Sequence, residues 1–256
     1  MTNAGEPATD SWDRGFVPPG LRIYCIGDVH GRSDLLKRCR THIETDLARR
    51  PVGHSMTIML GDYIDRGPDS RGVLDILTSE PFPNDLVALR GNHEQILLDF
   101  LEDPAVLNHW RLCGGLEALH SFGVPMQEVA RGRGYLEARD RLLDLMPDAH
   151  LRFIQETAAS GEIGGYFFCH AGVMPGVELH EQREEDLLWI RQPFLDHSLP
   201  FGKIVIHGHT ATERPELRAN RIGIDTGAYA TGRLTCLVLE GEEAGFLLPR
   251  QDRASA

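Results

Sequence analysis

Acidic, histidine and asparagine side chains recur directly after short apolar runs of this sequence. The first pair is Asp28 and His30; alternate residues of an extended segment project to one side, so both side chains can bind one ion. The other groups are Asp62, Asp65 and Arg66; Asn92 and His93; His170; and His207 and His209. Among metal ligands, carboxylates favour Mn²⁺ and imidazoles favour Fe or Zn. The mixture therefore predicts a site for divalent metals, and the lack of cysteine in this set disfavours a structural zinc site.

The apolar runs that precede these groups are short and rich in β-branched and aromatic residues, which is typical of buried strands. They cover residues 21–27, 55–61, 85–91, 165–170, 203–208, 221–227 and 233–241. Between the early runs, apolar residues recur at helical spacing over 33–50, 70–80 and 94–103, and Ser33 is placed to cap the first of these helices. This order of elements predicts an α/β domain with two sheets or one large mixed sheet, covered by helices.

The predicted elements also place the site and divide the chain. Every polar group follows the carboxyl end of a predicted strand, which is the edge of an α/β sheet where ligands bind. We expect a single domain over residues 21–249, with a helical block at 104–160 beside the site. Residues 1–20 are predicted to form a flexible arm and residues 250–256 a loose tail.

Composition excludes several classes of protein. The 256 residues are 41% hydrophobic and 25% charged, which is not the composition of a disordered chain, a collagen or a coiled-coil rod. The net charge of −12 is opposite to that of a generic nucleic-acid binder. The odd count of five cysteines disfavours a secreted disulfide framework. No apolar run approaches membrane-spanning length and the N-terminus lacks the apolar core of a signal peptide, so we expect no membrane partner and a cytoplasmic location.

Three motifs together resemble a known family. They are G-D-V-H-G at 27–31, G-D-Y-I-D-R-G at 61–67 and G-N-H-E at 91–94, followed by single histidines. This set resembles the binuclear metallophosphoesterases, most of all the phosphoprotein-phosphatase branch. That branch contains Ser/Thr protein phosphatases, small bacterial and phage enzymes, and symmetric diadenosine tetraphosphate hydrolases. The resemblance implies a calcineurin-like β-sandwich of two mixed sheets flanked by helices, with the metal site at the carboxyl ends of strands.

The resemblance also implies a role for each matching residue. Asp28 and His30 would bind the first of two divalent metals, Asp62 would bridge both, and Asn92, His170 and His209 would complete the second. His93 would be the general acid, oriented by Asp65, while Arg66 and Arg191 would bind phosphate. Mn²⁺ is the expected metal in vitro, with Fe, Zn or Ni as alternatives. A hydroxide activated by the two metals would attack phosphorus directly.

Other polar residues lie near these motifs. We expect His207 to be buried beside the site rather than to bind metal, and Arg90 to form a salt bridge. Asp225 and Tyr229 either line the rim or form a structural turn. The basic run at 131–141 contains acidic residues as well, so it is expected to be a solvated helix face, with a substrate-docking role as the alternative.

The function predicted from these features is removal of phosphate from phosphoserine and phosphothreonine in proteins. The segment H-W-R-L-C-G-G at 109–115 resembles part of the small bacterial protein phosphatases. One alternative is symmetric hydrolysis of diadenosine tetraphosphate, with an adenine pocket built from aromatic residues of the 100–160 block. Another is an inactive scaffold that binds phosphorylated partners, which the complete set of site residues argues against. The expected partners are phosphorylated proteins or small phosphoesters, and the oligomeric state stays open.

Overall fold

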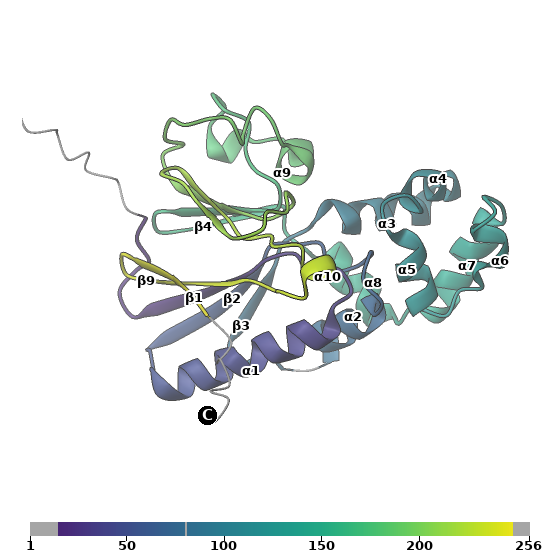
Figure 1. The fold of residues 1–256 in the computed structure, drawn as a ribbon, viewed down its shortest axis with the longest axis horizontal. Helices are drawn as coiled ribbons and strands as arrows, with labels where there is room; N and C mark the ends of the chain where they lie inside the picture. Colours follow the sequence, from purple (N-terminus) through teal and green to yellow (C-terminus); the bar gives the residue numbers. More distant parts are fainter. Residues whose placement is uncertain (1–14, 80, 248–256) are drawn as a thin grey trace, which may run out of the picture.

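Two five-stranded sheets lie face to face at the centre of the computed structural model, which describes residues 15–79 and 81–247 (Figure 1). In spatial order, the first sheet contains β10 (Glu243–Phe246), β9 (Cys236–Glu240), β1 (Leu21–Ile26), β2 (His54–Met59) and β3 (Asp85–Ala88). The second contains β4 (Ser160–Ile163), β5 (Tyr166–Cys169), β6 (Ile204–His207), β8 (Arg221–Gly223) and β7 (Glu216–Leu217).

Each sheet mixes parallel and antiparallel pairs. Strands β1, β2 and β3 are parallel, whereas β9 pairs with β1 and β10 with β9 in antiparallel register. In the second sheet β5, β6 and β8 are parallel, and β4 and β7 are antiparallel edge strands. The predicted fold class, an α/β protein with two mixed sheets flanked by helices, is confirmed.

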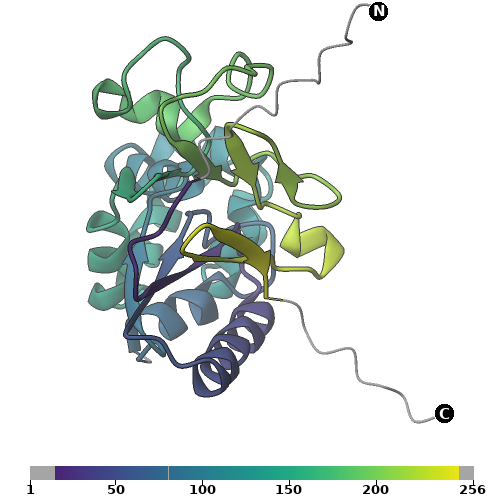
Figure 2. The same cartoon turned by 90° about the vertical axis from the view of Figure 1, so that its left-hand side faces the viewer.

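Helices cover the outer faces of both sheets and one end of the molecule. They are α1 (Ser33–Arg49), α2 (Ser70–Ser79), α3 (Asn92–Glu102), η1 (Pro104–Val106), α4 (Leu107–Trp110), α5 (Gly115–Ser121), α6 (Met126–Val129), α7 (Tyr135–Leu145), α8 (Asp148–Gln155), η2 (Leu179–Glu181), α9 (Glu184–Trp189) and α10 (Ala228–Thr231). In Figure 1, α1 and α2 lie under the first sheet, α9 lies over the second, and the helices from α3 to α7 extend to one side. Figure 2 shows the same molecule turned by 90°, with α1 at the bottom and the second sheet above the first. None of the helices in the described part of the chain is long and apolar enough to cross a membrane.

The alternation of side chains along each strand divides the core. In β1, Ile23 and Cys25 face the second sheet, and Tyr24 and Ile26 face the helices. Likewise, Tyr166 and Phe168 of β5 point between the sheets, while Phe167 and Cys169 pack beneath the α9 segment. Because both faces of the parallel strands are buried, their sequences are continuous apolar runs. The rigid sandwich fixes the loops at its carboxyl edge.

The structure also corrects local expectations. Helix α3 begins at Asn92 instead of residue 94, so Asn92 and His93 lie in its first turn. Ser33 does not cap α1; it is the first helical residue, and its hydroxyl donates a hydrogen bond to Asp69. Strands β4, β7 and β10 were not expected, because these short edge strands lack an apolar run.

Of the two terminal segments, only residues 15–20 are among the described residues. Within the expected arm at 1–20, residues 1–14 lie outside the described residues. Val17 is buried between the sheets, and its N–H donates to Gly241 O at 2.8 Å. The expected tail at 250–256 also lies outside the described residues.

Candidate active site and metal centre

The six expected metal ligands come from five segments of the chain and meet at one edge of the sandwich. Asp28 and His30 follow β1, Asp62 follows β2, Asn92 begins α3, His170 follows β5, and His209 follows β6. All six are buried, with exposed fractions between 0% and 8%. Both sheets therefore deliver their parallel strand ends to this point, as the sequence pattern predicted.

The Asp62 carboxylate lies between two groups of imidazoles. Its Oδ2 is 3.4 Å from His30 Nε2 and 3.7 Å from His93 Nε2. Its Oδ1 is 3.4 Å from His170 Nε2. The candidate ligand atoms of Asp62, His30 and His93 lie within 4.8 Å of one another, and so do those of Asp62, His170 and His209. Asp62 is thus the residue that both groups share.

Asn92 completes the second group. Its Oδ1 is 2.9 Å from His170 Nε2 and 2.9 Å from His209 Nδ1. An amide oxygen and two imidazole nitrogens converge here beside the shared carboxylate. Oxygen and nitrogen donors of this kind suit first-row divalent ions.

Backbone carbonyls orient two of these imidazoles. His30 Nδ1 lies 2.9 Å from Ile64 O, and His170 Nδ1 lies 2.9 Å from Leu60 O. Since each Nδ1–H donates to a carbonyl, the lone pair of each Nε2 is directed into the site. Burial lowers the pKa of His30 to about 3, and burial together with His170 lowers the pKa of His209 to about 2. Neutral imidazoles are the form that binds metal.

The pKa of the Asp28 carboxyl shifts in the opposite direction. Burial, Asp225 and Asp62 raise the pKa of Asp28 well above its usual range. Gly208 permits a close approach here, because an added Cβ would lie 2.0 Å from Asp28 Oδ1. A divalent cation would relieve the repulsion between these carboxylates. The donor set, its tautomers and its charge therefore fit a pair of divalent metals.

His93 belongs to a separate hydrogen-bonded pair. Its Nδ1 is 2.6 Å from Asp65 Oδ2, and Trp110 Nε1 donates to the same oxygen at 2.6 Å. Burial lowers the pKa of His93, but Asp62 and Asp65 outweigh it and raise the pKa to about 9. Asp65 therefore favours the protonated form of His93, which is the form that can donate a proton.

Two arginines and an aromatic side chain border the cluster. Arg66 Nη1 is 2.8 Å from His30 Nε2, and its Nη2 is 3.0 Å from His93 Nε2. Exposed Arg191 donates to Thr210 Oγ1 at 3.1 Å, next to His209. Tyr229 lies on the rim, with its ring 5.3 Å from the Arg66 guanidinium carbon and 5.5 Å from the His30 ring. Asp225 forms a turn beside Asp28, accepting from Gly227 N at 2.8 Å.

Backbone strain is concentrated at this site. Within the described ranges, the non-glycine residues with positive φ are His30, Asp62, Asp65, Arg66 and His209, at 43°, 53°, 72°, 63° and 63°. All five are residues that the sequence motifs single out. Non-glycine residues adopt this region at a cost, and they hold it where the surrounding structure enforces it.

Two residues outside the predicted site, Glu94 and Trp110, help to hold this strained backbone in place. Glu94 accepts from the backbone N–H of Asp62 and Tyr63, both at 2.8 Å, and of Gly91 at 3.0 Å. It thereby ties the loop after β2 to the start of α3. The G-N-H-E spacing could have indicated it, since Glu at the third helical position is typical of a capping box. The contact of Trp110 with Asp65 has no such local signal.

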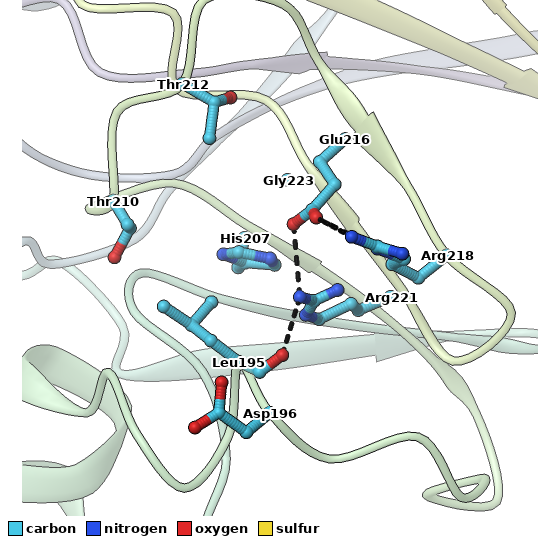
Figure 3. Close-up of a pocket in the computed structure, with 9 residues that line it drawn as sticks. All are labelled: Leu195, Asp196, His207, Thr210, Thr212, Glu216, Arg218, Arg221 and Gly223. Atoms are coloured by element: carbon cyan, nitrogen blue, oxygen red, sulfur yellow. Dashed lines mark hydrogen bonds and ion pairs between the residues drawn. The ribbon is translucent and has the colours of Figure 1, made fainter.

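The remaining expectations concern residues outside the cluster. His207 is buried and lines a separate cavity of about 250 Å³, where Glu216 binds both Arg218 and Arg221 (Figure 3). Arg90 forms an ion pair with Glu184 at 3.2 Å, as expected. The arginines of the 131–141 run form exposed ion pairs with neighbouring acids, which fits a solvated face.

Comparison with known proteins agrees with the fold and the site. Residues 21–235 match the family described as calcineurin-like phosphoesterase. The chain is 41% identical over 224 residues to Serine/threonine-protein phosphatase 1 of Salmonella typhimurium (strain LT2), covering 83% of this chain and 89% of the relative. It is 26% identical over 232 residues to the asymmetrical bis(5'-nucleosyl)-tetraphosphatase PrpE of Anoxybacillus flavithermus, covering 83% and 88%. A crystal structure of a candidate diadenosine tetraphosphatase superposes with a TM-score of 0.59 at 18% identity, covering 94% and 96%.

The chain therefore belongs to the calcineurin-like phosphoesterase family. It is a metallophosphoesterase, a hydrolase of phosphoesters, so the predicted resemblance is confirmed and the inactive scaffold is not supported. Members of this family use a binuclear divalent metal site, and the His and Asp groups described above can hold such ions.

The shared position of Asp62 gives a direct prediction. Asp62→Asn keeps the shape of the side chain but removes the charge between the two ligand groups, so it should lose both metals and activity together. Metal content per chain, measured by elemental analysis after desalting, checks this. Asp144→Asn, which changes an exposed carboxylate on α7, is the matched control and should keep the wild-type content. Two retained metals per chain in Asp62→Asn would contradict the shared role.

Proposed function

We propose that this protein is a phosphomonoesterase that removes phosphate from phosphoserine and phosphothreonine in proteins. The observation that carries the proposal is the His93–Asp65 pair, 2.6 Å apart and beside the shared Asp62 carboxylate. Serine and threonine leave as alkoxides, which need a proton, and a protonated imidazole held by a carboxylate can supply it. The relative named Serine/threonine-protein phosphatase 1 supports the same substrate class.

In this mechanism each group of the site has one task. Asp28, His30 and Asp62 would hold one divalent ion, and Asp62, Asn92, His170 and His209 would hold the other. When bound, the two ions lower the pKa of water and neutralise charge on the phosphoryl oxygens. Arg66 and Arg191 hold the phosphoryl group from the rim, Arg66 through its planar pair of donors. His93, held by Asp65 through Nδ1, would protonate the leaving oxygen through Nε2.

The alternative substrate is a dinucleoside tetraphosphate. The relative named as an asymmetrical tetraphosphatase supports this class of substrate, and symmetrical cleavage stays the alternative prediction. The expected adenine pocket in the 100–160 block would have to use aromatic residues of which most are buried. Phe100, Trp110 and Phe122 are buried in the core, and Tyr135 and Phe153 pack against it. The three buried side chains are therefore not free to stack on a base, whereas Tyr135 and Phe153 are only partly buried.

The metal and the location complete the proposal. We propose Mn²⁺ as the ion that supports activity in vitro, because three carboxylates, Asp28, Asp62 and Asp225, lie in or beside the cluster and favour a hard ion. All five cysteines are free, and all but Cys113 are buried, which suits a reducing compartment. We accordingly propose a cytoplasmic location.

A substrate panel tests the proposed class. With Mn²⁺ added, we expect kcat/KM to be higher for phosphoserine and phosphothreonine peptides than for diadenosine tetraphosphate. Initial rates of phosphate release and of nucleotide products, measured on one metal-loaded preparation, give the comparison. Preferred hydrolysis of the dinucleotide would reject the protein-phosphatase proposal while leaving the phosphoesterase chemistry intact.

Replacing His93 tests the proton donor. His93→Asn should keep both metals and lose about 10²–10⁴-fold in turnover on a phosphoserine peptide, because the leaving alkoxide has lost its acid. Turnover of 4-nitrophenyl phosphate, whose leaving group scarcely needs a proton, should fall much less. Steady-state kinetics on both substrates is the measurement. An equal loss on the two would mean that His93 acts in some other way.

Replacing Arg66 tests phosphate recognition. Arg66→Ala should raise the inhibition constant of inorganic phosphate and lower kcat/KM, because a planar fork that grips two phosphoryl oxygens is lost. Arg66→Lys should recover only part of both, since lysine offers a single point charge. The inhibition constants are measured under saturating Mn²⁺. If phosphate binds the Ala variant as tightly as the wild type with both metals present, Arg66 does not contact the phosphoryl group.

A further inference from the structure

The turn at residues 110–115 reaches from the helical block to the catalytic loop after β2. At its start, Trp110 Nε1 donates to Asp65 Oδ2 at 2.6 Å, the oxygen that also lies 2.6 Å from His93 Nδ1. Asp65 is fully buried, and its Oδ1 has no hydrogen-bond partner in the described part of the chain. Among the described residues, the indole N–H is therefore the one side-chain donor besides His93 that fixes the orientation of this carboxylate.

The indole itself is held firmly. Trp110 is 0% exposed, and its ring centroid lies 5.1 Å from that of Phe100 in α3. Gly115 also packs against the ring, and an added Cβ there would lie 2.5 Å from the indole. A side chain packed this closely has a single position, so its N–H points at Asp65 in a fixed direction.

The other end of the turn contacts the phosphate-binding arginine. The N–H of Arg66 donates to Gly114 O at 3.1 Å. Gly114 has a φ of 105°, and an added Cβ would lie 2.6 Å from both the backbone nitrogen and Cγ of Arg66. Asp65 and Arg66 are themselves strained, with φ of 72° and 63°. Trp110 and Gly114 thus brace the two consecutive strained residues from the same turn.

We propose that the 110–115 turn is a positioning element of the active site, with Trp110 orienting the Asp65–His93 pair and Gly114 positioning Arg66. The inference rests on the proposed function, in which His93 is the proton donor and Arg66 binds phosphate. The helical block then sets the geometry of His93 and of Arg66 through separate contacts. The two contacts should therefore fail with different kinetic signatures.

The first arm removes the indole N–H. W110F, and a variant with benzothienylalanine at this position that replaces N–H by sulfur in the same ring shape, should lower kcat on a phosphoserine peptide about tenfold, a part of what a general acid supplies. KM, metal content and kcat on 4-nitrophenyl phosphate should change less than about twofold. F100L, which disturbs the same packing without touching Asp65, is the matched control and should not discriminate between the two substrates.

The second arm displaces Arg66. G114A should raise the inhibition constant of inorganic phosphate at least about threefold, because charge-assisted contacts to phosphoryl oxygens depend on geometry. It should reduce turnover of the two substrates alike. G123A is the matched control: Gly123 also has positive φ, at 85°, but an added Cβ would meet only Leu145 at 4.0 Å. G123A should leave the inhibition constant of inorganic phosphate unchanged.

The outcomes separate this inference from the proposed function. If His93→Asn discriminates between the two substrates and neither variant at Trp110 does, the proton donor stands and the positioning role is rejected. If His93→Asn does not discriminate either, the proposed function itself fails. Equal losses on both substrates in the benzothienylalanine variant, like those in F100L, would show that Trp110 only stabilises the fold. An unchanged phosphate inhibition constant in G114A would reject the role of Gly114.

Discussion

The arrangement of this active site depends on one residue, Asp62. Its carboxylate lies 3.4 Å from imidazole nitrogens of both His30 and His170, so it joins the loops that follow β1 and β5. Its backbone oxygen accepts from Val29 N at 3.0 Å and His30 N at 2.9 Å, and its N–H donates to Glu94. A buried carboxylate with this many neighbours constrains all of them, because an unpaired buried charge is costly. The loops at the carboxyl edges of the two sheets consequently meet around the Asp62 carboxylate.

A second layer of contacts keeps that point in a conformation the chain would not adopt alone. Carbonyl oxygens fix the tautomers of two imidazoles, Glu94 binds consecutive backbone N–H groups, and the 110–115 turn braces Asp65 and Arg66. Strained backbone persists where such contacts prevent it from relaxing to a more favourable conformation. The fold thus places a pre-organised cluster for cations inside a chain whose net charge is −12.

Much of this was predictable, and the exceptions have physical reasons. The apolar runs predicted the central strands, and the polar groups after them predicted which residues would meet, since parallel strand ends share one edge. Periodicity could not reveal β7, a two-residue edge strand, or the start of α3 at Asn92, where the N-cap residue is Gly91 and has no side chain. Trp110 and Asp65 are 45 residues apart, and their contact depends on how the helical block packs. Local pattern holds no information about such a contact.

The proposed mechanism requires two divalent ions that share the Asp62 carboxylate. Anomalous diffraction from crystals grown with Mn²⁺ tests it most directly. We expect two anomalous peaks about 3.5–4 Å apart, one coordinated by His30 and the other by His170, with Asp62 oxygen atoms bound to both. A single peak, or two peaks of which only one contacts Asp62, would contradict the shared role of this carboxylate.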